Sequence, residues 1–258
     1  MDKEQYLKRI NYTGGLEPNI ALLSELQKRH LLNIPFENLD IHYKKHIELN
    51  IESIYKKIVE DNRGGFCYEL NGLFYELLLS LNFEAKRISA RVYTDETDYS
   101  PEFDHFAIIV KIGNVEYLTD VGFGEFSFKP LELILGKPQK DHRANYVIDK
   151  YDEHYFRVNK MEKGKLKPEY IFTTLARDFM DYKKMCEFHQ SDSRSNFMKK
   201  RLISLATESG RITITNNILK VRKNNLVEER ILNNETEFEN ELWDNFRIKI
   251  VKSVGDNL

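Results

Sequence analysis

The segment Arg63–Asn71 places a cysteine where a thiol could act as a nucleophile. Cys67 follows two glycines and begins a run of apolar residues with the spacing of a helix. The unpaired N–H groups and the dipole at a helix start favour the thiolate, the nucleophilic form of cysteine, and could face an oxyanion. A free cysteine is also commonly a small buried hydrophobe, so position alone leaves both roles open for Cys67. For the second cysteine, Cys186, we expect only a packing role.

A thiol nucleophile needs a base, and the base needs a group that orients it. A predicted β-hairpin supplies both. Its two-residue turn is Gly113–Asn114, and that turn makes Asp120 face Ala107 on the neighbouring strand. His105 is two residues from Ala107 and therefore lies on the same face as Asp120, one diagonal step away. The two side chains can span that distance with a hydrogen bond, whereas a slip of one residue would put them on opposite faces.

Two further features of the hairpin bear on this register. Lys111 would face Glu116, which is a favourable pair of opposite charges. Both faces of the hairpin are otherwise apolar, and buried polar groups need partners. We therefore predict that His105 and Asp120 are paired inside the protein, although a histidine and an aspartate near strand ends can also lie on the surface.

Helices are expected to position Cys67. Apolar residues with helical spacing follow Pro18–Asn19, with the proline just inside the helix start, and Asn50, which is a plausible N-cap. We expect Gly64–Gly65 to stop the second of these helices. A third helix, apolar on more than one side, is predicted to begin near Cys67.

From about Ala85 the pattern changes to that of strands. The predicted strands are Ile88–Tyr93, Phe106–Ile112, Val115–Val121, Asn145–Ile148, His154–Asn159, Tyr170–Thr173, Arg201–Leu205, Arg211–Thr215, Ile218–Val221 and Val227–Leu232. Helices are predicted over Arg177–His189 and Glu235–Phe246. The order of helices, then strands, then a mixed end predicts an α+β fold and not alternating βαβ units.

The composition limits the classes of protein to which the chain can belong. The chain has 258 residues, of which 41% are hydrophobic and 31% charged, which is typical of a globular protein and excludes disorder as its main state. A net charge of −2 gives no basic field for a nucleic-acid partner. No apolar run approaches a membrane span, and the N-terminus shows no apolar signal segment. With two cysteines, both expected as free thiols, we expect a cytoplasmic protein.

Several motifs together resemble those of the arylamine N-acetyltransferases. In chain order they are Arg29–His30 followed by Ile34–Asp40, then Arg63–Asn71, His105 before a strand, and Asp120–Gly124. Each motif alone is unspecific, but the set in this order is specific, and it covers most of the chain up to about Leu135. The resemblance implies a catalytic triad of Cys67, His105 and Asp120, the last two of which are also paired by the predicted hairpin.

The resemblance also implies three modules around a core like that of the cysteine proteases. The first is a helical module with the nucleophile, at residues 1–84. The second is an antiparallel β-barrel that carries the histidine and the aspartate, at 85–190. The third is an α/β C-terminal lid, at 191–258.

The implied reaction transfers an acetyl group from acetyl-CoA to an aromatic amine, a hydrazine or a hydroxylamine. Cys67 would take the acetyl group and release CoA, and the amine would then attack the acetyl-cysteine, which predicts ping-pong kinetics. His105 would move the protons and Asp120 would hold the imidazole. For the acceptor pocket the resemblance suggests Phe36 and Phe123, either of which can equally be a core phenylalanine.

Contacts with the coenzyme are expected around Gly124 and at a turn of Gly210 and Arg211, which could meet its phosphates. The chain departs from the family pattern at Glu125, where relatives often have a further glycine. The acidic loop that contains Phe103 could simply be solvated. Alternatively, this phenylalanine could border the site as a third substrate-binding residue.

Other chemistry is less well supported by the sequence. His42 and His46 have helical spacing but no matching glutamate or cysteine, so we expect no metal. Cysteine hydrolases and transglutaminase-like enzymes use similar nucleophile sets and are the main alternative, and a non-catalytic binding protein on an enzyme fold is a third. The sequence names neither the physiological acceptor nor the oligomeric state.

Overall fold

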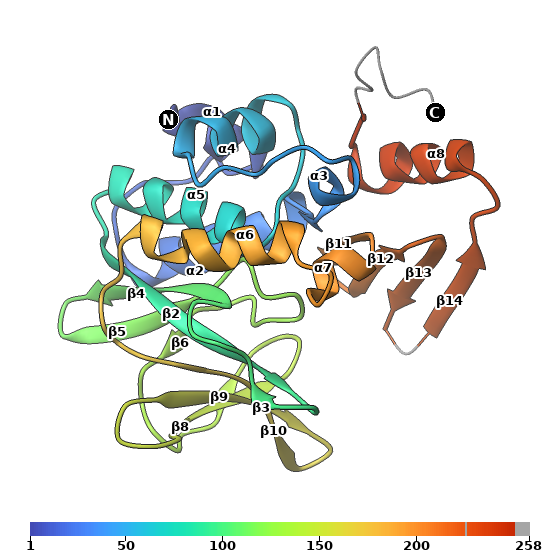
Figure 1. The fold of residues 1–258 in the computed structure, drawn as a ribbon. Coiled ribbons are helices and arrows are strands. Elements are labelled where there is room, and N and C mark those ends of the chain that lie inside the picture. Colours follow the sequence, from blue (N-terminus) through green and yellow to red (C-terminus); the bar gives the residue numbers. More distant parts are fainter. Residues whose placement is uncertain (225, 251–258) are drawn as a thin grey trace.

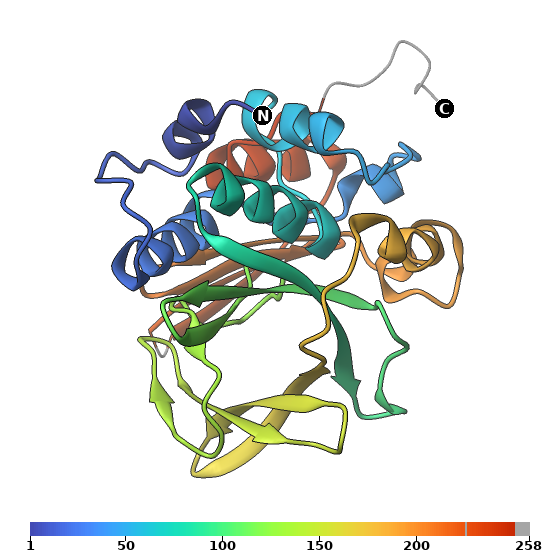
Figure 2. The ribbon, with the colours of Figure 1, turned by 90° about the vertical axis from the view of Figure 1, so that its left-hand side faces the viewer.

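The computed structural model of the chain describes residues 1–224 and 226–250. Its helices gather on one side of a curved sheet, and a second, smaller sheet lies beside them with the last helix (Figure 1). Turned by 90°, the strands of the curved sheet are seen to wind into a nearly closed barrel below the helices (Figure 2). The α+β class is confirmed, with N-terminal helices, an antiparallel barrel and a C-terminal sheet with a helix.

The N-terminal part holds most of the helices. They are α1 (Lys3–Arg9), α2 (Ile20–Asn33), α3 (Leu39–His42), α4 (Ile51–Tyr55), a π-helical turn at Lys56–Glu60 and α5 (Cys67–Ser80). Asn19 is the N-cap of α2, and its side chain accepts a hydrogen bond from the N–H of Leu22. Pro18 therefore precedes the cap, and its predicted place just inside the helix start is wrong.

The helix before the nucleophile begins as predicted but ends earlier. Asn50 is the N-cap of α4, and its side chain accepts a hydrogen bond of 3.0 Å from the N–H of Ser53. The helical stretch ends at Glu60, and Asn62 adopts a left-handed conformation with a φ of 52°. The prediction that Gly64–Gly65 stop this helix is wrong, because an asparagine can end a helix in that conformation.

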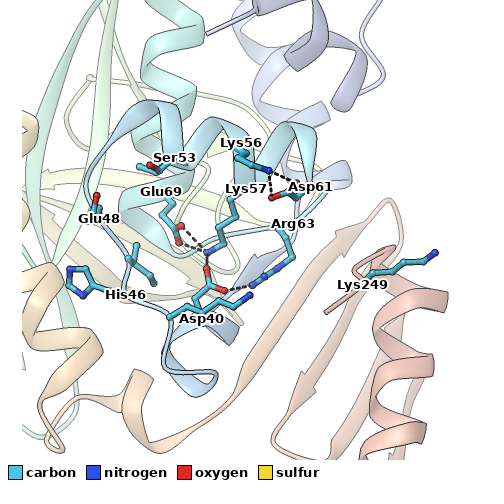
Figure 3. A pocket seen from close by; sticks show the side chains of 13 residues that line it. Asp40, His46, Glu48, Ser53, Lys56, Lys57, Asp61, Arg63, Glu69 and Lys249 are labelled. Carbon is cyan, nitrogen blue, oxygen red and sulfur yellow. Dashed lines mark hydrogen bonds and ion pairs between the residues drawn. The ribbon is translucent and has the colours of Figure 1, made fainter. Parts of the chain in front are cut away.

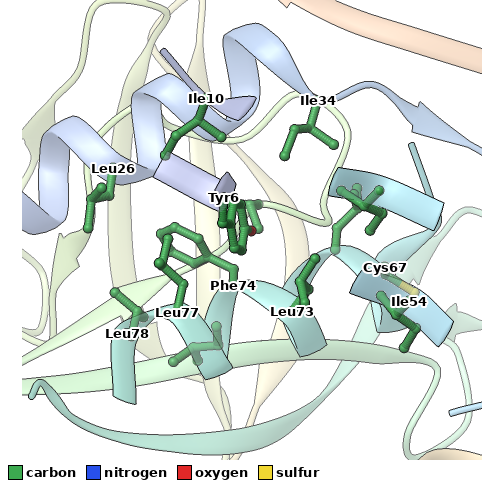
Figure 4. Close-up of a cluster of buried hydrophobic side chains, with 14 of the residues drawn as sticks. Tyr6, Ile10, Leu26, Ile34, Ile54, Cys67, Leu73, Phe74, Leu77 and Leu78 are labelled. Carbon is green, nitrogen blue, oxygen red and sulfur yellow. The ribbon is translucent and has the colours of Figure 1, made fainter. Parts of the chain in front are cut away.

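Helix α5 is the centre of the larger hydrophobic core. Most of its residues are buried, starting with Cys67. Tyr6, Leu26 and Ile54 from the other helices pack round it (Figure 4), and Phe106 from the barrel belongs to the same cluster. A helix that is apolar on all sides must be enclosed, so helices and barrel together fix where α5 begins.

The barrel sheet is antiparallel. Its strands are β2 (Glu84–Thr94), β4 (His105–Ile112), β5 (Val115–Thr119), β6 (Leu131–Glu132), β7 (Gln139–Lys140), β8 (Asn145–Lys150), β9 (Phe156–Glu162) and β10 (Lys165–Phe172), with the short β3 (Asp98–Tyr99) paired to β2. Their order across the sheet is β6-β5-β4-β2-β10-β9-β8-β7. The outermost strands, β6 and β7, are only two residues long.

The hairpin of β4 and β5 has the predicted register, with Lys111 opposite Glu116. Asp120 directly follows β5 and lies just beyond the regular pairing. The predicted ion pair between the two opposed side chains does not form. Each finds a partner on β2 instead, since Lys111 contacts Glu84 at 3.4 Å and Glu116 contacts Lys86 at 2.9 Å.

The remaining elements follow the barrel in the chain. They are a 3-10 turn at Phe179–Tyr182, α6 (Lys183–Ser191), α7 (Asn196–Lys199), β11 (Leu202–Thr207), β12 (Gly210–Thr215), β13 (Ile218–Lys223), β14 (Leu226–Ile231) and α8 (Glu235–Phe246). The last helix has the predicted bounds. The helix predicted over Arg177–His189 starts later, as the 3-10 turn, and runs on to Ser191.

The second sheet takes one strand from the N-terminal part. Strand β1 (Phe36–Glu37) pairs with β11, and the sheet order is β1-β11-β12-β13-β14. Phe36 also forms a parallel bridge with Gly65, just before α5. The proposed modules are thus interlocked, and their boundaries after residues 84 and 190 stay a prediction. Within residues 1–224 and 226–250, no helix is long and apolar enough to cross a membrane.

Candidate active site

A cavity of about 520 Å3 lies where α5 begins, between the barrel and the second sheet. Cys67 and His105 both line it. Its wall is rich in aromatic side chains, including Phe36, Phe123 and Phe197. The nucleophile and the base predicted from the sequence therefore share one cavity, and its walls suit a planar, apolar ligand.

Asp120 holds the imidazole of His105. Nε2 of His105 donates a hydrogen bond of 2.6 Å to Oδ2 of Asp120, and both side chains are buried. The other carboxylate oxygen, Oδ1, accepts hydrogen bonds from the N–H groups of Gly122 (2.9 Å) and Phe123 (3.0 Å). Because Nε2 is engaged, Nδ1 is the ring nitrogen that could take a proton from the thiol.

Asn71 joins the nucleophile helix to this pair. It lies four residues after Cys67, on the same face of α5. Its Nδ2 donates to Oδ1 of Asp120 at 2.9 Å and to the carbonyl of Phe106, and its Oδ1 accepts from the N–H of Val121 at 2.9 Å. Asn71 has no role among the residues predicted from the sequence, although an asparagine four residues after a cysteine in an apolar helix is a signal for one.

Gly122 lets the aspartate loop approach α5. A β-carbon at this position would lie 2.8 Å from the α-carbon of Cys67 and 2.7 Å from Nδ2 of Asn71. A larger residue would have to push the loop and the helix apart. The loop that carries Asp120 is therefore packed directly on the first turn of α5, which fixes the aspartate relative to the cysteine.

The thiol of Cys67 is not acidic by itself. Burial raises its pKa well above the ordinary value, and the carboxylates of Asp104 and Asp120 add to the effect, while the backbone N–H of Tyr68 opposes it. A thiolate in this position needs a compensating charge. Transfer of its proton to Nδ1 of His105 would supply an imidazolium beside it, so His105 is the candidate for activating the thiol.

A buried cluster of charges lies behind the nucleophile loop, along a second cavity of about 530 Å3 (Figure 3). Nζ of Lys57 lies 2.8 Å from Oδ2 of Asp40 and 2.8 Å from Oε1 of Glu69. The guanidinium of Arg63 lies 2.8 Å from Glu37 and 2.9 Å from Asp40. Two cations and three carboxylates are therefore each paired, as buried charges require.

This charge cluster fixes the residues just before the thiol. Oε2 of Glu69 accepts a hydrogen bond of 3.1 Å from the N–H of Phe66, which caps α5. Burial raises the pKa of Glu69 to about 6, against the effect of the neighbouring lysine. Nearby, a β-carbon on Gly64 would lie 2.0 Å from the carbonyl oxygen of Pro35, so only glycine lets the loop pass there.

The three phenylalanines predicted for the acceptor pocket lie in different places. Phe36 and Phe123 line the cavity, whereas Phe103 is not among its lining residues. The ring of Phe103 packs edge-on against Tyr182, with 5.3 Å between centroids, and lies 5.4 Å from the guanidinium of Arg177. Phe103 therefore packs against residues that, like itself, do not line the cavity.

Two of the three residues predicted for the coenzyme line the cavity, namely Gly124 and Arg211. They are joined, since the guanidinium of Arg211 donates a hydrogen bond to the carbonyl of Gly124. A β-carbon on Gly210 would lie 2.0 Å from the carbonyl oxygen of Arg222, so this glycine allows two strands to approach. Glu125, the departure from the family pattern, also lines the cavity and forms an ion pair with Arg222.

Comparisons with known proteins agree with this geometry. The family model described as N-acetyltransferase matches residues 19–254. The arylamine N-acetyltransferase of Gallus gallus known as pineal gland isozyme NAT-3 is 31% identical over 98% of this chain and 96% of its own length. Arylamine N-acetyltransferase 1 of Homo sapiens is 30% identical over 99% and 98%. The chain belongs to the arylamine N-acetyltransferase family.

Solved arylamine N-acetyltransferases share the fold over almost the whole chain. The M. tuberculosis structure has a TM-score of 0.89 at 28% identity and covers 96% of this chain and 94% of its own. The Mycobacterium marinum structure, solved in complex with CoA, has a TM-score of 0.88 at 28% identity and covers 96% and 93%. The Bacillus cereus structure, with a TM-score of 0.89 at 26% identity and coverage of 96% and 98%, reveals a Cys-His-Glu triad. In the present N-acetyltransferase the carboxylate on His105 is Asp120.

The two neighbouring lysines of the π-helical turn test the buried charge cluster. Lys57→Met leaves Glu69 without its cation, so we expect the free energy of unfolding to fall by about 3 kcal/mol. Lys56 is exposed and pairs with Asp61 at the surface, so Lys56→Met should change stability little. Urea unfolding of both variants measures the difference. Equal stability of the two would mean that the cluster does not support the fold.

Alkylation of Cys67 tests its dependence on His105. In a Cys186→Ser background, we expect His105→Gln to slow the reaction with iodoacetamide at pH 7 by about 100-fold or more, because the thiol alone has a raised pKa. The rate in this variant should rise with pH up to the stability limit of the protein. The alkylation rates are measured by stopped flow or by mass spectrometry. Similar rates with and without the imidazole of His105 would contradict the dependence of Cys67 on His105.

Proposed function

We propose that the protein transfers an acetyl group from acetyl-CoA to aromatic amines through an acetyl-cysteine on Cys67. Family membership makes it an acetyl-CoA-dependent arylamine N-acetyltransferase. The observation that carries the mechanism is that Cys67 and His105 line one cavity while His105 donates a hydrogen bond of 2.6 Å to Asp120. A nucleophile, a base and an orienting carboxylate are the parts that acyl transfer requires.

The first step acetylates the enzyme. Nδ1 of His105 takes the thiol proton, and the sulfur of Cys67 attacks the thioester carbonyl of acetyl-CoA. N–H groups at the start of α5 face the developing oxyanion. The carbon–sulfur bond to CoA then breaks, and CoA leaves as a thiol with the proton from the imidazole. Asp120 keeps the imidazole oriented and stabilises its charged form.

The second step uses the same residues in the same geometry. The acceptor amine attacks the carbonyl of acetyl-Cys67, and His105 takes a proton from the amine nitrogen. The bond to sulfur breaks, the N-acetyl product leaves, and the thiol recovers its proton. Because CoA leaves before the amine reacts, the kinetics are ping-pong.

Aromatic walls favour planar acceptors, which include aromatic amines and aryl hydrazines or hydroxylamines. We retain Phe36 and Phe123 as contacts for the acceptor ring. Phe197 joins them, because its ring lies 6.0 Å from that of Phe36 and lines the same cavity. Phe103 is not one of the acceptor contacts in this proposal, because it does not line the cavity.

Arg211 is our candidate for the phosphates of CoA. It lines the cavity beside Gly124, and we assign Gly210 the supporting role of letting its strand pack. Lys220, on the neighbouring strand, already pairs with Glu229 at 2.7 Å. Within residues 1–224 and 226–250 there is no cluster of three or more histidine, cysteine, aspartate or glutamate side chains that could hold a metal, and the proposed steps use none.

We place the protein in the cytoplasm. Cys67 and Cys186 are both free thiols. The first must stay reduced for the covalent step, which a reducing compartment ensures.

Incubation with acetyl-CoA alone tests the covalent step. We expect the wild-type protein and Cys186→Ser to gain the mass of one acetyl group and to release an equal amount of CoA, because the amine is not needed for the first step. Cys67→Ser should gain nothing. Peptide mapping then shows which residue carries the acetyl group. An unmodified Cys67, with cleavage of amide substrates instead, would favour a cysteine hydrolase.

Substitutions of Arg211 test the coenzyme contact. Loss of hydrogen bonds from a charged group to a phosphate costs about 2 kcal/mol, so Arg211→Met should raise the KM for acetyl-CoA by at least about tenfold. Arg211→Lys should recover part of the affinity because it keeps the charge. Lys220→Met, on the neighbouring strand, serves as the control and should leave the KM unchanged. An unaltered KM in Arg211→Met would remove this residue from the coenzyme site.

A further inference from the structure

A second histidine–aspartate pair lines the same cavity as the thiol. Nε2 of His189, on α6, lies 3.2 Å from Oδ1 of Asp104. The side chains are only 7% and 17% exposed. The acetyl-transfer steps do not use this pair, because His105 is held by Asp120 instead. The presence of this nearly buried polar pair in an otherwise aromatic wall therefore needs an explanation of its own.

The pair is held rigidly from both sides. The ring of His189 lies 5.1 Å from that of Phe197 and 6.0 Å from that of Tyr68. The hydroxyl of Tyr68 donates a hydrogen bond of 3.1 Å to the carbonyl of Asp104. Tyr68 is the residue next to the nucleophile on α5, so the pair has a fixed position relative to the acetyl group that Cys67 would carry.

Both ring nitrogens of His189 have a polar neighbour. Nδ1 lies 3.2 Å from Oγ of Ser195, and the same Oγ accepts a hydrogen bond from the N–H of Phe197. Nε2 lies 3.2 Å from the carboxylate of Asp104 but makes no hydrogen bond within residues 1–224 and 226–250.

Within the described residues, no lysine or arginine forms an ion pair with Asp104, whose one charged neighbour is His189. The other carboxylate in the wall, Glu125, is paired with Arg222. Of the two arginines in the wall, Arg194 is paired with Asp192 at 2.7 Å, and Arg211 donates to the carbonyl of Gly124 and to Oγ of Ser204. Oδ2 of Asp104 makes no hydrogen bond within residues 1–224 and 226–250. Asp104 thus offers a hydrogen-bond acceptor in the wall of the cavity that Cys67 also lines.

We propose that Asp104 and His189 form a specificity site for the acceptor, which selects neutral aromatic amines with a hydrogen-bond donor on the ring and disfavours anionic ones. A ring hydroxyl or hydrazide N–H would donate to Oδ2 of Asp104. A ring carboxylate would face a like charge in a poorly solvated wall, which is costly. The inference rests on the acetyl-transfer function proposed above.

Two matched pairs of acceptors test this site. Methyl 4-aminobenzoate and 4-aminobenzoate differ in charge but little in shape, and 4-aminophenol and 4-methoxyaniline differ in the donor. For the wild-type enzyme we expect a kcat/KM at least about tenfold higher for the ester than for the acid, and higher for the phenol than for the ether. Asp104→Asn should reduce the preference for the ester by about tenfold. A wild-type enzyme that uses acid and ester equally would overturn the inference, even if the variant fails to fold.

Glu125→Gln is the matched control, since it removes the other carboxylate of the wall, whose charge is already paired. It should leave the ratio of ester to acid as in the wild type, and an equal response of both variants would refute a special role for Asp104. Acetylation of Cys67 by acetyl-CoA alone is measured in every sample. If Cys67 is acetylated and the ratio does not respond, only the specificity site is wrong; if it is not acetylated, the proposed function fails and the inference falls with it.

Discussion

The carboxylate of Asp120 is the point at which the nucleophile helix and the barrel are tied together. It accepts hydrogen bonds from the imidazole of His105 on β4, from the amide of Asn71 on α5 and from two N–H groups of its own loop. Its buried charge is thereby fully compensated. Because one group contacts both the helix that carries Cys67 and the imidazole of His105, it links the position of the thiol to that of the imidazole.

The start of α5 is held from its other side by the buried charge cluster. Lys57 and Arg63 pair there with three carboxylates, one of which, Glu69, also caps the helix. Buried ion pairs bring little net stability once desolvation is counted, whereas loss of one partner is expensive. The main effect of this cluster is therefore on position. Its ion pairs hold the loop before Cys67 in one conformation between the helices and the second sheet.

Local patterns in the sequence were sufficient for the parts of the site that lie on regular elements. The turn at Gly113–Asn114 gave the register that pairs His105 with Asp120, and the spacing of apolar residues gave the start of α5. Contacts between distant segments were beyond such reasoning. Neither the parallel bridge of Phe36 nor the approach of His189 to the cavity has a local signal, because both depend on how separate elements pack.

Through Phe36 and its short strand, the second sheet does more than cover the cavity. The strand supplies one edge of that sheet, forms a bridge to Gly65 beside the nucleophile loop and contributes a wall of the cavity. A chain cut before residue 191 would keep Cys67, His105 and Asp120 but would lose the strand that orders this edge. Recombination between relatives is constrained in the same way, since the segment around Phe36 has to be inherited together with the sheet encoded some 170 residues later.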